Sequence, residues 1–166
     1  ATFVETAMNT TDVCHSIFVV KNGKLYCSMG DRHQVVTIPL NEPWNKTTVV
    51  VGSMGGLPGS SAATLRHPRG IFVDSYLRLY IADTRNNRVQ RVSSGTNAGV
   101  TLIGPGSSST ITLNGPTAVI LDYWLYVFIA DTGNHRIVGG GANGYRCVVG
   151  CSNSYGPAAD QLNGPS

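Results

Sequence analysis

Residues 81–89, IADTRNNRV, recur 48 residues later as IADTGNHRI at residues 129–137. The Asp, the Asn three residues after it and the Arg five residues after it keep their places in both copies. Two stretches that agree in residue type and register over so long a distance indicate an internal repeat. A weaker copy lies upstream at residues 28–35, where Met29 stands in place of the Asp and Gln34 in place of the Arg.

The repeats set the expected domain organisation. The residues LNGP at 113–116 return at 162–165, so we expect the last residues of the chain to open a further repeat. The chain is then one partial domain over residues 1–166, divided into repeats of about 13–66, 67–114 and 115–162, with 163–166 as the start of another.

Within each repeat the hydrophobic pattern predicts strands. In the second repeat the apolar runs cover residues 71–73, 79–82, 89–92 and 100–103, with turn residues between them. Four short β-branched or aromatic runs within about 50 residues are typical of one blade of an all-β repeat protein. In the third repeat we expect Gly139 to Gly141 to interrupt the third strand, because glycine gives a strand no side chain to pack.

The pattern Pro-x-Gly-Ile-x-Val-Asp, followed by Leu-Tyr-Ile-Ala-Asp-x-x-Asn-x-Arg-Val, occupies residues 68–89, and most of it returns at 116–137. This pattern resembles the NHL repeat, and the resemblance extends over about residues 13–165. The family implies a β-propeller of four-stranded antiparallel blades, commonly six of them. This chain would then hold about three blades, which form a partial ring.

A partial ring implies a partner. A blade buries its faces against its neighbours, so three blades alone leave two apolar faces uncovered. We expect further blades of a longer protein, or a second copy of the chain, to cover them. The propeller loops are the other expected place for a protein partner.

The polar signature of the repeat is interpreted as structural. Asp and Asn hydrogen-bond nearby backbone amides, and Arg pairs with an Asp across a turn. A signature that recurs in successive blades usually stabilises the blade and does not form one site. These structural residues are Asp74, Asp83, Asn86, Arg88, Asp122, Asp131, Asn134 and Arg136.

Composition excludes some classes of function. The 166 residues are only 13% charged, and the net charge of +3 comes from 12 basic and 9 acidic residues scattered along the chain. We therefore expect no nucleic-acid partner. No apolar run approaches about 18 residues, so no membrane span is predicted.

Four cysteines form two local pairs, and an even number of cysteines permits two disulfides in any of three connectivities. A bridge within each local pair is plausible. A zinc site is the weaker alternative, because the first pair is too widely spaced for a zinc knuckle. The disulfide candidates are Cys14, Cys27, Cys147 and Cys151.

Two N-glycosylation sequons begin at Asn9 and Asn45. Paired cysteines, sequons and a surface rich in uncharged polar residues agree with one another. They predict a secreted, extracellular glycoprotein.

No catalytic, cofactor-binding or metal-ligating residue is assigned from the sequence. No Gly-x-Ser-x-Gly or HExxH motif occurs, and the glycine-rich residues 52–56 open no helix. The four histidines are interpreted as surface residues, because no ligand set converges; they are His15, His33, His67 and His135.

Three aromatic residues, Tyr76, Tyr123 and Trp124, fall in the turns between first and second strands. If exposed, they could form a binding rim. Packing between adjacent blades is the alternative, and it is slightly favoured.

The function favoured by the sequence is a non-enzymatic extracellular propeller that serves as a protein-interaction, structural or assembly module. The alternative is a propeller enzyme of the lyase or lactonase kind, with a metal site completed by blades outside this chain. Some lyases that resemble this family use His ligands with a catalytic Tyr and Arg, and their His positions are not matched residue by residue in this sequence.

Overall fold

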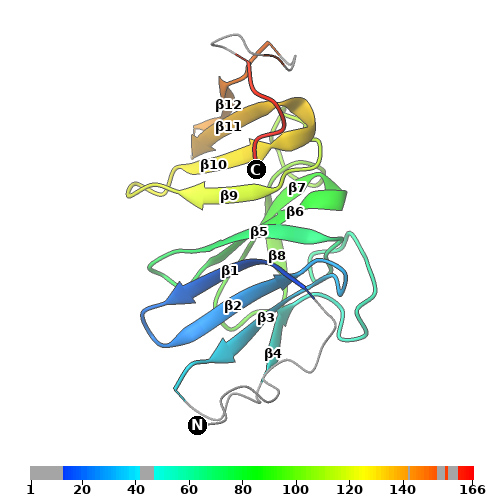
Figure 1. Cartoon of the computed structure of the whole chain (residues 1–166), viewed down its shortest axis with the longest axis vertical. Coiled ribbons are helices and arrows are strands. Elements are labelled where there is room, and N and C mark those ends of the chain that lie inside the picture. Colours follow the sequence, from blue (N-terminus) through cyan, green and yellow to red (C-terminus); the bar gives the residue numbers. More distant parts are fainter. Residues whose placement is uncertain (1–12, 42–46, 142, 153–155, 157–160) are drawn as a thin grey trace.

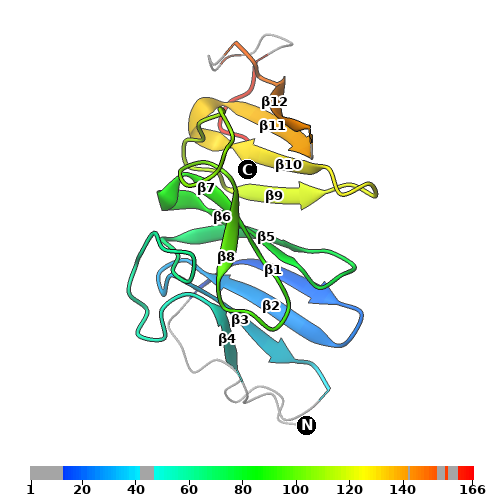
Figure 2. The ribbon, with the colours of Figure 1, turned by 180° about the vertical axis from the view of Figure 1, so that it is seen from behind.

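The computed structural model describes residues 13–41, 47–141, 143–152, 156 and 161–166, and it is built almost wholly from β-strands. The strands form three four-stranded antiparallel sheets, stacked one beside the next along the long axis (Figure 1). Figure 2 shows the same stack from behind. The predicted all-β fold of propeller blades is confirmed.

Each sheet is a meander in which neighbouring strands are consecutive in the sequence. Blade 1 contains β1 (Cys14–Val20), β2 (Lys24–Met29), β3 (Gln34–Pro39) and β4 (Thr48–Val51). Blade 2 contains β5 (Pro68–Val73), β6 (Leu79–Asp83), β7 (Arg88–Val92) and β8 (Gly99–Ile103). Blade 3 contains β9 (Ala118–Leu121), β10 (Val127–Asp131), β11 (Arg136–Gly141) and β12 (Gly144–Val149).

The two helical segments among the described residues are single 3₁₀ turns, η1 (Thr84–Asn86) and η2 (Thr132–Asn134). Each joins the second strand of its blade to the third. Neither is nearly long enough to cross a bilayer, and the described chain has no other helix that could.

Apolar side chains pack between the blades. One cluster joins blades 1 and 2, with Val20 and Val35 of blade 1 against Ile71 and Val73 of blade 2. The rings of Phe18 and Phe72 meet edge to face in the same layer, with centroids 5.0 Å apart. A second cluster joins blades 2 and 3 and includes Tyr80, Val89, Ile103, Leu113, Val119, Val127, Ile129 and Val138.

Within the described residues, only the middle blade has a neighbouring blade on both faces. All five residues of β6 are buried, which explains its continuous apolar run. In the inner strand of blade 1, alternate residues face away from blade 2, and Ile17 and Val19 are 61% and 54% exposed. In the inner strand of blade 3, Ile120 is 57% exposed.

The glycines of the third repeat do not interrupt their strand, and that prediction was wrong. β11 runs through Gly139, Gly140 and Gly141 and pairs with both β10 and β12. The ladder needs only backbone groups, and the missing side chains leave room for the ring of Phe128 beside Gly139.

The cysteines pair locally, which selects one of the three open connectivities. Cys14 bonds to Cys27 across β1 and β2, with Cα atoms 5.5 Å apart. Cys147 bonds to Cys151 at the end of β12, with Cα atoms 5.6 Å apart. The first bridge joins two strands of one blade, and the second closes a short loop.

Replacing both Cys14 and Cys27 by Ser should lower the free energy of unfolding by about 3 kcal/mol, because the bridge limits a long loop in the unfolded chain. Replacing both Cys147 and Cys151 by Ser should cost about 2 kcal/mol, since the loop is shorter. Urea denaturation of the two double variants measures both values. Free thiols in the unreduced wild-type protein, detected by intact mass after alkylation, would contradict both bridges.

Candidate functional site

An aspartate shapes the turn between the first two strands of blade 2. Oδ1 of Asp74 accepts the backbone N–H groups of Tyr76 and Arg78, both at 2.9 Å. Oδ2 accepts Nε of Arg78 at 2.6 Å. Leu77 within this turn has φ of +60°, a conformation that an L residue adopts only when its surroundings require it.

Blade 3 builds the same turn. Oδ1 of Asp122 accepts the backbone N–H groups of Trp124 and Tyr126, both at 2.9 Å, and Leu125 has φ of +66°. Tyr76 and Trp124 therefore occupy equivalent places, two residues after the carboxylate that holds the turn. The backbone under both aromatic side chains is tied to a fixed acceptor.

The aromatic residues of these turns face solvent, so the slightly favoured prediction that they pack between blades was wrong. The side chains of Tyr76, Tyr123 and Trp124 are 69%, 90% and 75% exposed. Tyr123 and Trp124 contact each other edge to face, with ring centroids 5.8 Å apart. The guanidinium of Arg78 lies over the ring of Tyr76 at 5.0 Å.

We call Tyr76, Tyr123 and Trp124, with the two turns that carry them, the aromatic hairpins. Both turns project on the same side of the molecule, at the left of Figure 1. The corresponding turn of blade 1, residues 21–23, is shorter and has no aromatic residue. The aromatic surface is therefore a property of blades 2 and 3.

A second carboxylate closes the other end of each of these blades. Oδ2 of Asp83 accepts Nδ2 of Asn86 and Nε of Arg88, both at 2.8 Å. Oδ1 accepts the backbone N–H of Arg66 at 2.7 Å. The remaining nitrogens of Arg88 donate to the carbonyl oxygens of Ser60, Ser61 and Thr64 in the segment that enters the blade.

We call the set of Asp83, Asn86 and Arg88 the carboxylate clasp of blade 2. Blade 3 has the same clasp, in which Asp131 accepts the N–H of Asn114 at 2.7 Å and the side chains of Asn134 and Arg136 at 2.8 Å. Blade 1 has a neutral counterpart, in which Met29 and Gln34 are buried and Gln34 donates to the carbonyl of Ser53.

The clasps are buried and therefore poor candidates for a ligand site. Asp83 and Asp131 have no exposed surface, and Arg88 is 5% exposed. Burial raises the pKa of Asp83, and the donors from Arg66, Asn86 and Arg88 act against that rise. The carboxylate thus depends on its hydrogen bonds to stay charged inside the blade.

Each blade also locks onto the start of the following repeat. The residue after the second turn has positive φ in all three blades, at His33, Asn87 and His135. Nδ1 of His33 accepts the backbone N–H of His67 at 3.0 Å, and Oδ1 of Asn87 accepts that of Gly115 at 2.8 Å. Nδ1 of His135 accepts the N–H of Gly164 at 3.1 Å.

The prediction that every histidine is a simple surface residue was wrong for His67. Its side chain is 13% exposed, and its Nε2 lies 3.2 Å from Oδ1 of Asp31. Its ring is 5.2 Å from that of His15 and 6.5 Å from that of His33. Burial lowers the pKa of His67, the charge of Arg85 lowers it further, and Asp31 acts in the opposite direction.

In the part of the chain that the structure describes, no group of three or more His, Cys, Asp or Glu side chains could hold a metal ion. The sequon asparagines Asn9 and Asn45 lie outside the described residues. Their glycosylation stays a prediction.

Sequence reasoning missed a group of polar side chains between blades 2 and 3. Arg78, Arg91, Tyr80 and Tyr145 line one cavity there. Tyr80 lies directly opposite Arg91 in the β6–β7 ladder, so a register derived from the two predicted strands would have placed these two together. Nothing in the sequence indicated that Tyr145 of the next blade would join them.

Residues 65–92 match the NHL repeat family model, so the resemblance expected for blade 2 is confirmed. No curated protein sequence matches the chain. The virginiamycin B lyase of Staphylococcus aureus is similar in structure, with a TM-score of 0.59 and 18% identity over 84% of this chain and 42% of the lyase.

Two structures from Bacteroides thetaiotaomicron are also similar. A protein of unknown function gives a TM-score of 0.63 at 15% identity, over 86% of this chain and 38% of its own. An auxiliary nutrient binding protein gives 0.58 at 18% identity, over 74% of this chain and 35% of its own. At such identity the likeness establishes the propeller fold, and this chain spans about two fifths of the length of these structures.

Replacing Arg88 by Met should lower the free energy of unfolding by about 3–5 kcal/mol, because it leaves the buried carboxylate of Asp83 without its charge partner. Adding Asp83→Asn to that variant should recover part of the loss, since no charge is then buried. Arg85→Met, on the exposed side of the same turn, is the control and should change stability by less than about 0.5 kcal/mol. Equal effects of the two Met variants in urea denaturation would refute the clasp.

The lowered pKa of His67 predicts a loss of stability in acid. Between that lowered pKa and about 6.5 the unfolded chain binds more protons than the folded one, so stability rises with pH in this window. The contribution is fully present above about pH 6.5 and is lost as the pH falls through the folded-state pKa. We expect His67→Gln to flatten the pH dependence of the free energy of unfolding between about pH 4.5 and 7.5.

His15→Gln is the matched control for that measurement, because His15 is exposed and contacts the same ring. It should keep most of the wild-type slope. An unchanged slope in His67→Gln would show that the buried imidazole does not contribute.

Proposed function

We propose that this chain is part of a non-enzymatic, extracellular propeller that binds a protein partner through the aromatic hairpins. The observation that carries the proposal is the exposure of Tyr76, Tyr123 and Trp124, at 69% to 90%, on turns that face the same side. Exposed aromatic residues clustered in this way are typical of interaction surfaces.

The turns suit such a role because they are held in place before binding. Asp74 and Asp122 each accept two backbone N–H groups of their turn, so ordering the backbone costs little when a partner arrives. Tyr and Trp have only two side-chain torsions, so they offer a large contact area at a low entropic cost.

An extracellular location is supported by the disulfides. All four cysteines are bridged, and reducing compartments keep most thiols free. Glycans at Asn9 and Asn45 would agree with secretion. A nutrient-binding protein among the similar structures is compatible with such a setting, although that likeness carries only the fold.

The exposed sheet faces support a second part of the proposal, namely that further blades complete the ring. Ile17 and Val19 at one end of the stack and Ile120 at the other are more than half exposed. In the middle blade the same kind of face is buried by a neighbour. Blades of a longer chain are the proposed cover, and a second copy is the alternative.

A lyase or lactonase stays the alternative function. The described residues contain no group of side chains that could hold a metal ion, so other blades would have to supply it. The activity in the name of the similar lyase belongs to that protein, since 18% identity establishes the fold alone.

The proposal is tested by replacing Tyr76, Tyr123 and Trp124 together by Ser in the full chain. Partners recovered from source extracellular fluid by affinity purification should fall about tenfold or more, because buried aromatic contacts dominate interface energy. Thermal stability should stay close to that of the wild type, because the three side chains are mostly exposed.

The matched control replaces Met54 and Leu57 by Ser. These side chains are 84% and 67% exposed and belong to the segment between β4 and β5, at the right of Figure 1. The control should recover the same partners as the wild type. Equal recovery by the control and the triple variant would show that the aromatic hairpins do not bind a partner.

A further inference from the structure

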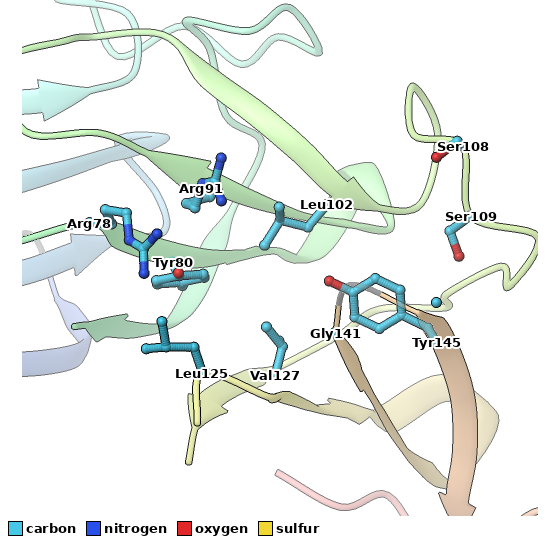
Figure 3. Close-up of a pocket in the computed structure, with 11 residues that line it drawn as sticks. Arg78, Tyr80, Arg91, Leu102, Ser108, Ser109, Leu125, Val127, Gly141 and Tyr145 are labelled. Atoms are coloured by element: carbon cyan, nitrogen blue, oxygen red, sulfur yellow. The ribbon is translucent and has the colours of Figure 1, made fainter. Parts of the chain in front are cut away.

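A cavity of about 430 Å³ opens between blades 2 and 3 (Figure 3). Arg78, Tyr80 and Arg91 of blade 2 face Val127 and Tyr145 of blade 3 across it. Its volume lies within the range of about 300–1,000 Å³ that small ligands occupy.

Glycines keep this cavity open. Gly141 and Gly144, at the turn between β11 and β12, line it with backbone alone. A Cβ atom on Gly144 would meet no atom within 4 Å, which shows that the space beside it is empty of protein. The backbone of these two glycines thus forms part of the cavity wall.

The two arginines of the cavity differ in their partners. Nε of Arg78 is bound to the carboxylate of Asp74 at 2.6 Å, so its charge is balanced. Nε of Arg91 is buried and has no hydrogen-bond partner among the described residues. The lining includes no Asp or Glu, so the charge of Arg91 meets no anion there.

The position of Arg91 directs it toward blade 3. It lies opposite Tyr80 in the β6–β7 ladder, and both residues line the cavity. Burial raises the pKa of the Tyr145 hydroxyl, and the charge of Arg91 acts in the opposite direction. A guanidinium, a phenol and the serine hydroxyls of Ser108 and Ser109 therefore border one space.

We propose that this cavity binds a small organic carboxylate, with its oxygens on Arg91 and its apolar body against Leu102, Leu125 and Val127. Because Nε is buried, the two terminal nitrogens of the planar guanidinium are the parallel donors that match the two oxygens of a carboxylate. The hydroxyl of Tyr145 is the further donor that blade 3 offers to the ligand. Leu125 and Val127 of blade 3 lie across the cavity from Arg91, and Leu102 lies on the side of blade 2.

The apolar wall distinguishes this ligand from an inorganic anion. A phosphate or sulfate ion would fill a small part of about 430 Å³ and leave Leu102, Leu125 and Val127 against water. A ring or branched chain attached to the carboxylate would bury these side chains. Arg78 and Leu125 of the lining belong to the turns of the aromatic hairpins, but Tyr76, Tyr123 and Trp124 do not line the cavity, so the proposal does not depend on the function proposed above.

Titration of the full chain with benzoate tests the proposal. Calorimetry should detect saturable binding, and the Nε–H resonance of Arg91 should shift in parallel. Benzamide, which has the same shape without the charge, should bind at least tenfold more weakly. Inorganic phosphate should also bind at least tenfold more weakly, because it lacks the apolar body.

Two variants connect binding to the cavity. Arg91→Gln should weaken benzoate binding at least tenfold, whereas Arg85→Gln, an exposed arginine outside the cavity, should leave it unchanged. Tyr145→Phe removes only a hydroxyl and should weaken binding about threefold, which keeps the test decisive if Arg91→Gln does not fold. The proposal would be overturned if benzamide or phosphate bound as tightly as benzoate. Wild-type affinity for benzoate in both Arg91→Gln and Tyr145→Phe would also overturn it.

Discussion

The buried carboxylate of Asp83 connects the second strand of blade 2 to three other parts of the chain. It ties the second strand to the turn through Asn86, to the third strand through Arg88, and to the entering segment through the N–H of Arg66. Arg88 extends the network to the carbonyls of residues 60, 61 and 64. Because a buried charge is costly unless every partner is present, the cluster favours one arrangement of strand, turn and linker.

The turn next to each clasp also connects its blade to the following repeat. The turn closed by each clasp ends in a residue of positive φ, and its side chain accepts the N–H that begins the following repeat. Thr84 and Thr132 add a bond to the carbonyls of Pro116 and Pro165. The polar signature therefore fixes the spacing of blades as well as their shape, and the apolar clusters then fill the layers between them.

The proposed functions rest on residues outside the carboxylate clasps. The turns of Asp74 and Asp122 also hold their backbone on a carboxylate, and Asp74 is buried against Arg78, but these turns carry exposed aromatic side chains. Between them the glycines of blade 3 leave a cavity with an arginine that has no internal partner.

The sequence by itself determined the blade. The Asn and the Arg of the clasp follow the Asp by three and five residues, and both hydrogen-bond to it. Because these contacts are local in the sequence, the spacing of the three residues predicts the turn. The apolar runs predict the strands equally well, because each strand pairs with the next one in the sequence and the pairing is also local. The prediction failed for β11, which ends in three glycines. Backbone groups make the hydrogen bonds of its ladder, and the pattern of side chains does not show these groups.

Only the tertiary structure decided which surfaces are free and which side chains meet across blades. Burial of His67 depends on rings 52 and 34 residues earlier in the chain, His15 and His33. The cavity that Arg91 and Tyr145 both line depends on how blade 3 is placed on blade 2. A repeating pattern specifies which face of a strand is apolar. The particular pairs between sheets follow from their packing, where small differences such as a glycine in place of a side chain decide between a filled layer and a cavity.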